Sequence, residues 1–233
     1  MHIYLDIETL PTADPDIIAD IASTITPPGN ISKAETIAAW EVEKKPALVA
    51  QAVAKTSFDT LAGSIACICW AMDDGPVQYT ACHGGEDGML ATFFKTLSAD
   101  LQAPHSRIEA ETHTYVGHNL AGFDLPFLKH RAIVHGIKPN ASLWKAMHAK
   151  PWDSCIADTM LMWSADRERR VGLDRLCRAM GIPGKGDFDG SMVAATWPVD
   201  PEKVIRYCKD DVERVRALYK RLTFQGAALK VAA

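Results

Sequence analysis

Short apolar runs that favour strands alternate along this chain with longer segments whose apolar residues recur at helical spacing. Strands are predicted at residues 3–7, 64–72, 77–82 and 113–116. Asp74-Gly75 separates the second run from the third, which predicts a hairpin. Helices are predicted at residues 88–101, 123–135, 159–164, 173–180 and 201–222. Strands followed by helices, with a hairpin among them, indicate an α/β fold in which helices flank a mixed sheet.

The segment 11–63 has a different pattern, because it is rich in alanine and other helix-forming residues. Asp14, with a proline directly after it, predicts the start of one helix. Ser32 and Glu35 have capping-box spacing and predict the start of a second, longer helix. We interpret this segment as a helical insertion after the first strand, and not as a domain of its own.

The length of 233 residues fits one large domain, which we place at residues 1–222 with residues 223–233 as a C-terminal tail. The composition, with 48% hydrophobic residues, is that of an ordinary globular protein. A net charge of −4 argues against a protein that grips duplex nucleic acid through many phosphates. It leaves open an enzyme that holds a strand end through a few contacts and bound metal.

The sequence also bears on the compartment. No run of about 18 apolar residues occurs, and the N-terminus lacks a signal-peptide pattern, so we expect a cytoplasmic protein with no membrane segment. The six cysteines lie mostly in apolar runs, and none forms a C-x-x-C pair. We therefore expect reduced, buried core cysteines and no zinc site.

The first candidate for chemistry is the pair Asp6 and Glu8 in the first predicted strand. Residues two apart on a strand point to the same face, so the two carboxylates converge. Like charges in a partly buried place are costly unless a cation or a proton lies between them. The alternative is an edge strand with an acidic side that faces solvent.

The second candidate lies in the last predicted helix. Tyr207 and Asp211 are four residues apart and share the apolar stripe, whereas Asp210 falls on the solvated side. A carboxylate on an inward stripe needs a partner. A buried salt bridge or a hydrogen bond to a backbone amide would serve Asp211 equally well.

The third candidate is the segment 117–124, which follows a predicted strand and reads G-H-N-L-A-G-F-D. Its two glycines allow tight turning, and it places Asp124 at the start of a helix. The alternatives are a helix N-terminal charge for Asp124, core packing for Phe123 and a turn hydrogen bond for Asn119. Asp158, directly before another predicted helix, is interpreted as a helix cap and not as a fifth ligand.

Taken in order, the strand D-x-E, the H-N-x-x-x-F-D segment and the late Y-x-x-x-D resemble the DEDD superfamily of 3′–5′ exonucleases, in its tyrosine branch. That superfamily has a ribonuclease H-like fold. The stretch 185–191 and the motif that follows from Ile205 to Tyr219 are similar to the proofreading exonuclease domain of family B DNA polymerases. The resemblance covers nearly all of residues 1–222, and the insertion is its least matched part.

The resemblance implies a two-metal hydrolase. The carboxylates of Asp6, Glu8, Asp124 and Asp211 would hold two divalent ions, Mg²⁺ or Mn²⁺, about 3.5–4 Å apart. Tyr207 would position the attacking water, because an unperturbed tyrosine pKa of about 10 suits an orienting group better than a base. These five residues form the expected catalytic set.

The same resemblance implies contacts to the substrate. Thr9 and Leu10 would contact the terminal nucleotide, Asn119 and Phe123 would line the cleft, and Tyr207 would lie at the scissile phosphate. Phe123 offers a face on which a base can stack.

The resulting expectation is removal of nucleoside monophosphates from the 3′ end of single-stranded DNA. Because 233 residues leave no room for a polymerase, replication or repair proteins are the expected partners. One alternative is an exoribonuclease with the same catalytic set, since the choice depends on contacts to the 2′-hydroxyl. Another is a catalytically silent nucleic-acid-binding module, although such a copy would be expected to lose at least one carboxylate.

Overall fold

The computed structural model describes residues 1–102, 113–164 and 170–225. Most of the predicted tail, residues 226–233, lies outside the described residues. The chain divides into two compact units, one formed by Met1–Glu8 with Ile65–Ala233 and the other by Thr9–Ser64.

A five-stranded mixed sheet forms the centre of the larger unit. Its strands are β1 (His2–Leu10), β2 (Ser64–Met72), β3 (Gln78–Ala81), β4 (Thr114–Gly117) and β5 (Ile156–Asp158). They lie in the order β3-β2-β1-β4-β5. β4 runs parallel to β1 and β5, while β2 and β3 form the predicted antiparallel hairpin. β5, which is three residues long, is absent from the strands that the sequence predicts.

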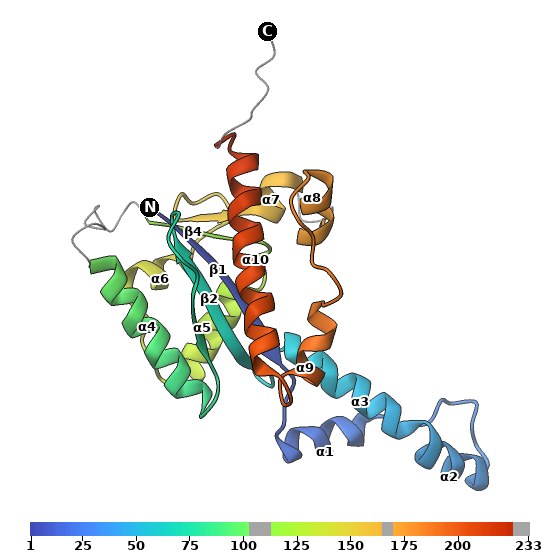
Figure 1. Cartoon of the computed structure of the whole chain (residues 1–233). Helices are drawn as coiled ribbons and strands as arrows, with labels where there is room; N and C mark the ends of the chain where they lie inside the picture. The colour runs from blue at the N-terminus through green and yellow to red at the C-terminus, as the bar shows by residue number, and fades with distance from the viewer. Residues whose placement is uncertain (103–112, 165–169, 226–233) are drawn as a thin grey trace. The chain divides into compact units, whose positions relative to one another are not determined.

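Helices cover both faces of this sheet, as the sequence predicts. α4 (Glu86–Gln102), α5 (Asp124–Val134) and α6 (Ala141–Ala146) contribute to a single apolar core on one face. α10 (Pro201–Leu222) lies on the other face (Figure 1). The described part of the unit also contains the shorter helices α7 (Thr159–Ser164), α8 (Leu173–Ala179) and α9 (Val193–Thr196) and a 3₁₀ turn at Gly190–Met192.

Successive side chains of β1 alternate between the two faces of the sheet. Ile3, Leu5 and Ile7 are buried in the core with α4 and α5. The intervening side chains point toward α10, where the Tyr4 ring lies 6.0 Å from that of Tyr219. The carboxylates of β1 follow the same alternation, so they point to the α10 face.

Local sequence explains the long helix α10. The Asp200 side chain accepts a hydrogen bond from the Lys203 N–H, and Pro201 occupies the first helical position. Val204, Val215 and Leu218 are buried along the predicted apolar stripe. The helix therefore begins and ends where the sequence predicts.

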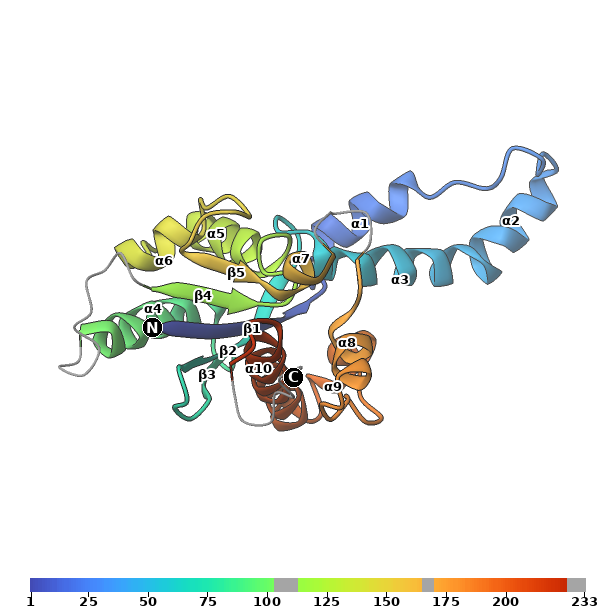
Figure 2. The ribbon, with the colours of Figure 1, turned by 90° about the horizontal axis from the view of Figure 1, so that it is seen from above.

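The smaller unit is helical. It contains α1 (Pro15–Thr24), α2 (Ala34–Glu43), α3 (Lys45–Lys55) and a 3₁₀ turn at Thr56–Phe58. α3 packs against both α1 and α2, and Figure 2 shows α1 and α3 side by side. The predicted cap is present, because Asp14 accepts a hydrogen bond from the Asp16 N–H.

Two predictions for this unit were wrong. The residue that caps α2 is Lys33, with no side-chain hydrogen bond, so Ser32 and Glu35 do not form a capping box. The second helix is also not longer than the first, because α1 and α2 both have ten residues; α2 ends at Glu43 and α3 begins at Lys45. Pro46 explains the break, since proline lacks an N–H and its ring clashes with the carbonyl of the preceding turn.

The helices and the cysteines of the described residues bear on the expected compartment. None of the helices in residues 1–102, 113–164 and 170–225 combines the length and the apolar character that a membrane span requires. All six cysteines are free, and every one except Cys82 is buried.

Candidate active site

Three carboxylates converge between β1 and α10, on the face of the sheet that α10 covers. Asp6 and Glu8 come from β1, and Asp211 comes from the buried stripe of α10. Each contributes one oxygen to a group whose members all lie within 4.8 Å of one another. The two-residue spacing on the strand and the inward stripe of the helix together produce this cluster.

Asp124 lies beside the same strand. It is the first residue of α5 and is only 3% exposed, so it is not a solvated helix-terminal charge. Its Oδ1 accepts a hydrogen bond of 3.2 Å from the backbone N–H of Ile7, the residue between Asp6 and Glu8. The structure therefore brings all four predicted carboxylates to one stretch of β1.

The carboxylates of the site lie close together in a buried place, which disfavours their ionised forms. Burial raises the pKa of Asp6 well above its usual value, and the charges of Asp211, Asp124 and Glu8 raise it further. Burial likewise raises the pKa of Glu8, and it raises that of Asp124 to about 8. A bound cation would relieve this repulsion, and carboxylate oxygens are the donors that Mg²⁺ and Mn²⁺ prefer. The residues present therefore fit divalent metal ions.

Two cations to which the sequence analysis assigned no role in the site contact Asp211. Lys185, in the loop between α8 and α9, places its Nζ 2.5 Å from Oδ2, and Arg214 places its Nη1 2.7 Å from Oδ1. Arg214 also donates to the carbonyls of Pro183 and Gly184, so it attaches this loop to α10. Arg214 lies three residues after Asp211, a spacing that could have indicated the contact.

Tyr207 lies one turn before Asp211 and also contacts Lys185. The lysine Nζ donates to the Tyr207 hydroxyl oxygen at 2.5 Å. The ring of Phe188 meets that of Tyr207 edge-on, with 5.0 Å between centroids. Burial, followed by the charge of Asp211, raises the pKa of Tyr207, so its hydroxyl stays protonated at neutral pH.

The loop before Asp124 is fixed by Asp158. The two carboxylate oxygens of Asp158 accept hydrogen bonds of 3.0 Å from the backbone N–H groups of Asn119 and Ala121. Asp158 also accepts from the Met160 N–H, as the predicted helix cap. Asn119 has a φ of 62°, a left-handed conformation that asparagine tolerates. Asn119 and Asp158 line the same small pocket.

The other predicted contact residues differ in their surroundings. Phe123 is half-buried and packs against Phe127, with 5.5 Å between ring centroids. Thr9 is buried, and its hydroxyl donates to the Ser57 carbonyl at 2.7 Å. Leu10 is half-buried. Thr9 and Leu10 belong to the smaller unit.

The sequence profile of one protein family matches residues 83–232, which is more than half of the chain. That family is described as predicted 3′–5′ exonucleases related to the exonuclease domain of PolB. The chain belongs to this family of 3′–5′ exonucleases. It is therefore a phosphodiester hydrolase that acts on nucleic acid. The matched segment contains Asp124, Tyr207 and Asp211, whereas Asp6 and Glu8 precede it.

The fold agrees with this assignment. The structure of the family B DNA polymerase from the hyperthermophilic archaeon Pyrobaculum calidifontis is similar, with a TM-score of 0.55 and 16% sequence identity. The similarity covers 95% of this chain and 24% of the polymerase chain. It confirms the predicted ribonuclease H-like fold. No match was found among curated protein sequences.

Proposed function

We propose that this exonuclease is a metal-dependent enzyme of the DEDD superfamily, tyrosine branch, that degrades single-stranded DNA from its 3′ end. The product of each step is a nucleoside monophosphate. The observation that carries the proposal is the convergence of Asp6, Glu8 and Asp211, with Asp124 hydrogen-bonded to the strand between the first two.

The four carboxylates are the proposed ligands for two divalent ions, Mg²⁺ or Mn²⁺. When bound, such ions supply an activated water and stabilise the charge on the leaving 3′ oxygen. The carboxylates themselves set where the ions lie. The N–H of Ile7 fixes Asp124, and Lys185 and Arg214 fix both oxygens of Asp211.

Tyr207 acts as an orienting donor in this proposal. Its hydroxyl oxygen already accepts a hydrogen bond from Lys185, so its own proton is free to be donated to a water or a phosphate oxygen. Its raised pKa keeps that proton in place at neutral pH. Lys185 positions the hydroxyl and adds positive charge beside the expected phosphate.

The substrate contacts are proposed on the same basis. The exposed part of Phe123 offers a surface for base stacking, and Asn119, four residues earlier in the same loop, offers a side-chain amide. Thr9 and Leu10, directly after Glu8, are proposed to contact the terminal nucleotide. The overall charge of −4 favours contacts to a single strand end over a long duplex footprint. Replication and repair proteins are the proposed partners.

The experiment compares 5′-labelled single-stranded DNA and RNA oligonucleotides with Mg²⁺, Mn²⁺ or a chelator. Asp211→Asn removes one proposed ligand, and Asp210→Asn is the matched control, because Asp210 is the adjacent, exposed carboxylate on the same helix. We expect a metal-dependent ladder that shortens from the 3′ end, with activity reduced at least about 100-fold in Asp211→Asn and unchanged in Asp210→Asn.

The outcomes separate the alternatives. Preferential degradation of RNA would replace the DNA substrate with RNA. Cleavage that persists in chelator, or that Asp211→Asn leaves intact, would contradict the proposed metal site. Binding of both oligonucleotides without cleavage would favour a silent nucleic-acid-binding protein.

A further inference from the structure

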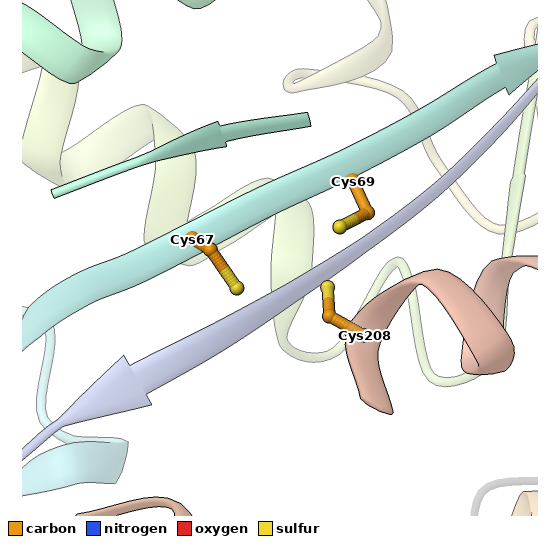
Figure 3. Close-up of side chains that lie close together, drawn as sticks. All are labelled: Cys67, Cys69 and Cys208. Carbon is orange, nitrogen blue, oxygen red and sulfur yellow. The ribbon is translucent and has the colours of Figure 1, made fainter. Parts of the chain in front are cut away.

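Three thiols form a second cluster next to the carboxylates. Cys67 and Cys69 lie two residues apart on β2, so their side chains point to the same face of the sheet, and Cys208 comes from α10, which covers that face. Their sulfur atoms all lie within 4.8 Å of one another. Figure 3 shows the three sulfur atoms pointing toward one another.

The surroundings of this cluster are not purely apolar. The Cys208 Sγ lies 3.3 Å from Oδ2 of Asp6 and 3.4 Å from the backbone carbonyl of the same residue. The three cysteines are fully buried, whereas Asp6 is partly exposed. Asp6 is therefore a polar, partly exposed neighbour of the otherwise buried sulfur atoms.

We propose that Cys67, Cys69 and Cys208 form a binding site for one soft divalent ion of the zinc class, with the Asp6 carboxylate as the fourth ligand. Zinc binds cysteine sulfur at about 2.3 Å, which places sulfur atoms around a tetrahedral ion about 3.8 Å apart. The observed spacing is compatible with that geometry after small side-chain rotations. The thiol protons are released to solvent as the ion binds.

The chemistry distinguishes this site from the carboxylate cluster. Three sulfur donors select soft ions such as Zn²⁺ and Cd²⁺, whereas oxygen donors select Mg²⁺ and Mn²⁺. Asp6 belongs to both clusters, so an ion on the thiols would withdraw this carboxylate from the other site. Inhibition of the exonuclease by Zn²⁺ or Cd²⁺ follows, and this consequence alone rests on the proposed function.

The test is a titration of the full chain with Cd²⁺, in a phosphine reductant that is not itself a thiol. Sulfur-to-cadmium charge transfer in the ultraviolet reports binding without any nuclease assay. We expect one Cd²⁺ per chain in the wild type and at least about tenfold weaker binding in Cys208→Ser. Cys155→Ser, which changes a buried cysteine outside the cluster, is the control and should bind as the wild type does.

Two further measurements test the thiol site separately. One does not depend on whether a variant folds, and the other distinguishes the thiol site from the carboxylate cluster. Cadmium NMR of the wild-type chain reports the number of sulfur ligands, and three are expected. Asp211→Asn should retain the charge-transfer band, because that residue lies in the carboxylate cluster only. Absence of the band in the wild type, a sulfur count below three, or an unchanged band in Cys208→Ser would overturn the proposal.

Discussion

Lys185 and Asp211 form an ion pair of 2.5 Å inside the carboxylate cluster, although 26 positions separate them in the sequence. Arg214 completes the arrangement, because it contacts the other oxygen of Asp211 and the carbonyl of Gly184, the residue before Lys185. The loop and α10 are therefore joined at the site itself. The charge of Lys185 also lowers the pKa of both Asp6 and Glu8, in opposition to burial and to the other carboxylates.

Lys185→Gln should lower exonuclease activity by about 10- to 100-fold and shift the acidic limb of the pH–rate profile to higher pH. Without the ammonium, the pKa of Asp6 and Glu8 rises, so a higher pH is needed to ionise them. The matched control is Lys220→Gln, which breaks an ion pair with Asp74 at the surface. If the rate falls but the acidic limb stays at the same pH as in the wild type, the electrostatic role of Lys185 is contradicted.

The metal-free protein should become less stable as pH rises from about 4 to about 8. Burial raises the pKa of Asp124 from 3.8 to about 8, so the folded chain retains a proton that the unfolded chain has released. The stability that this difference contributes is complete below the unfolded pKa and is lost as pH rises through the folded pKa. Because each pKa unit corresponds to about 1.4 kcal/mol, the loss is on the order of a few kcal/mol.

Thermal unfolding in chelator, measured across this pH range, checks the effect. Asp124→Asn should flatten the dependence, and Asp210→Asn should leave it unchanged. Added Mn²⁺ should reverse the decrease, because the ion competes with protons for the carboxylates and binds more tightly as pH rises. A melting temperature in chelator that rises steadily with pH would contradict the assignment.

The parts of the site that the sequence predicts are those held by regular elements. Asp6 and Glu8 are two apart on a strand and Asp211 lies on an apolar helical stripe, so the period of each element determines where these side chains point. The contacts of Lys185 and Arg214 with Asp211 are not predicted, because charged residues on loops and helix surfaces are usually solvated. Only the path of the loop shows that they contact Asp211.

The same distinction applies to the fold. The bounds of α10 agree with the prediction, because a cap, a proline and a long apolar stripe are consistent with one another. β5 is missed because three residues are too few to show a period, and its pairing with β4 is decided by the sheet. The Ser32 cap fails because capping spacing is only a local preference, and the chain begins the helix at a different residue.

Asp158→Ala should lower the free energy of unfolding by about 1–3 kcal/mol, because it leaves the partly buried backbone N–H groups of Asn119 and Ala121 without their acceptor. Activity should fall as well, since the loop that Asp158 holds leads directly into Asp124. Chemical denaturation gives the first quantity, and the nuclease assay gives the second. Asp153→Ala, which removes an exposed turn hydrogen bond to the Lys150 N–H, should cost less than about 1 kcal/mol and serves as the control.

Tyr207→Phe should lower the exonuclease rate by about 100-fold, the usual cost of removing one preorganised donor. The ring is retained, so its edge-on contact with Phe188 and the position of Lys185 4.6 Å from the ring centroid remain available. Stability and Mn²⁺ affinity should therefore match the wild type, which separates loss of the hydroxyl from loss of the site. Tyr79→Phe, on the edge strand β3, is the control. A variant that binds Mn²⁺ normally and cleaves at the wild-type rate would exclude Tyr207 from the reaction.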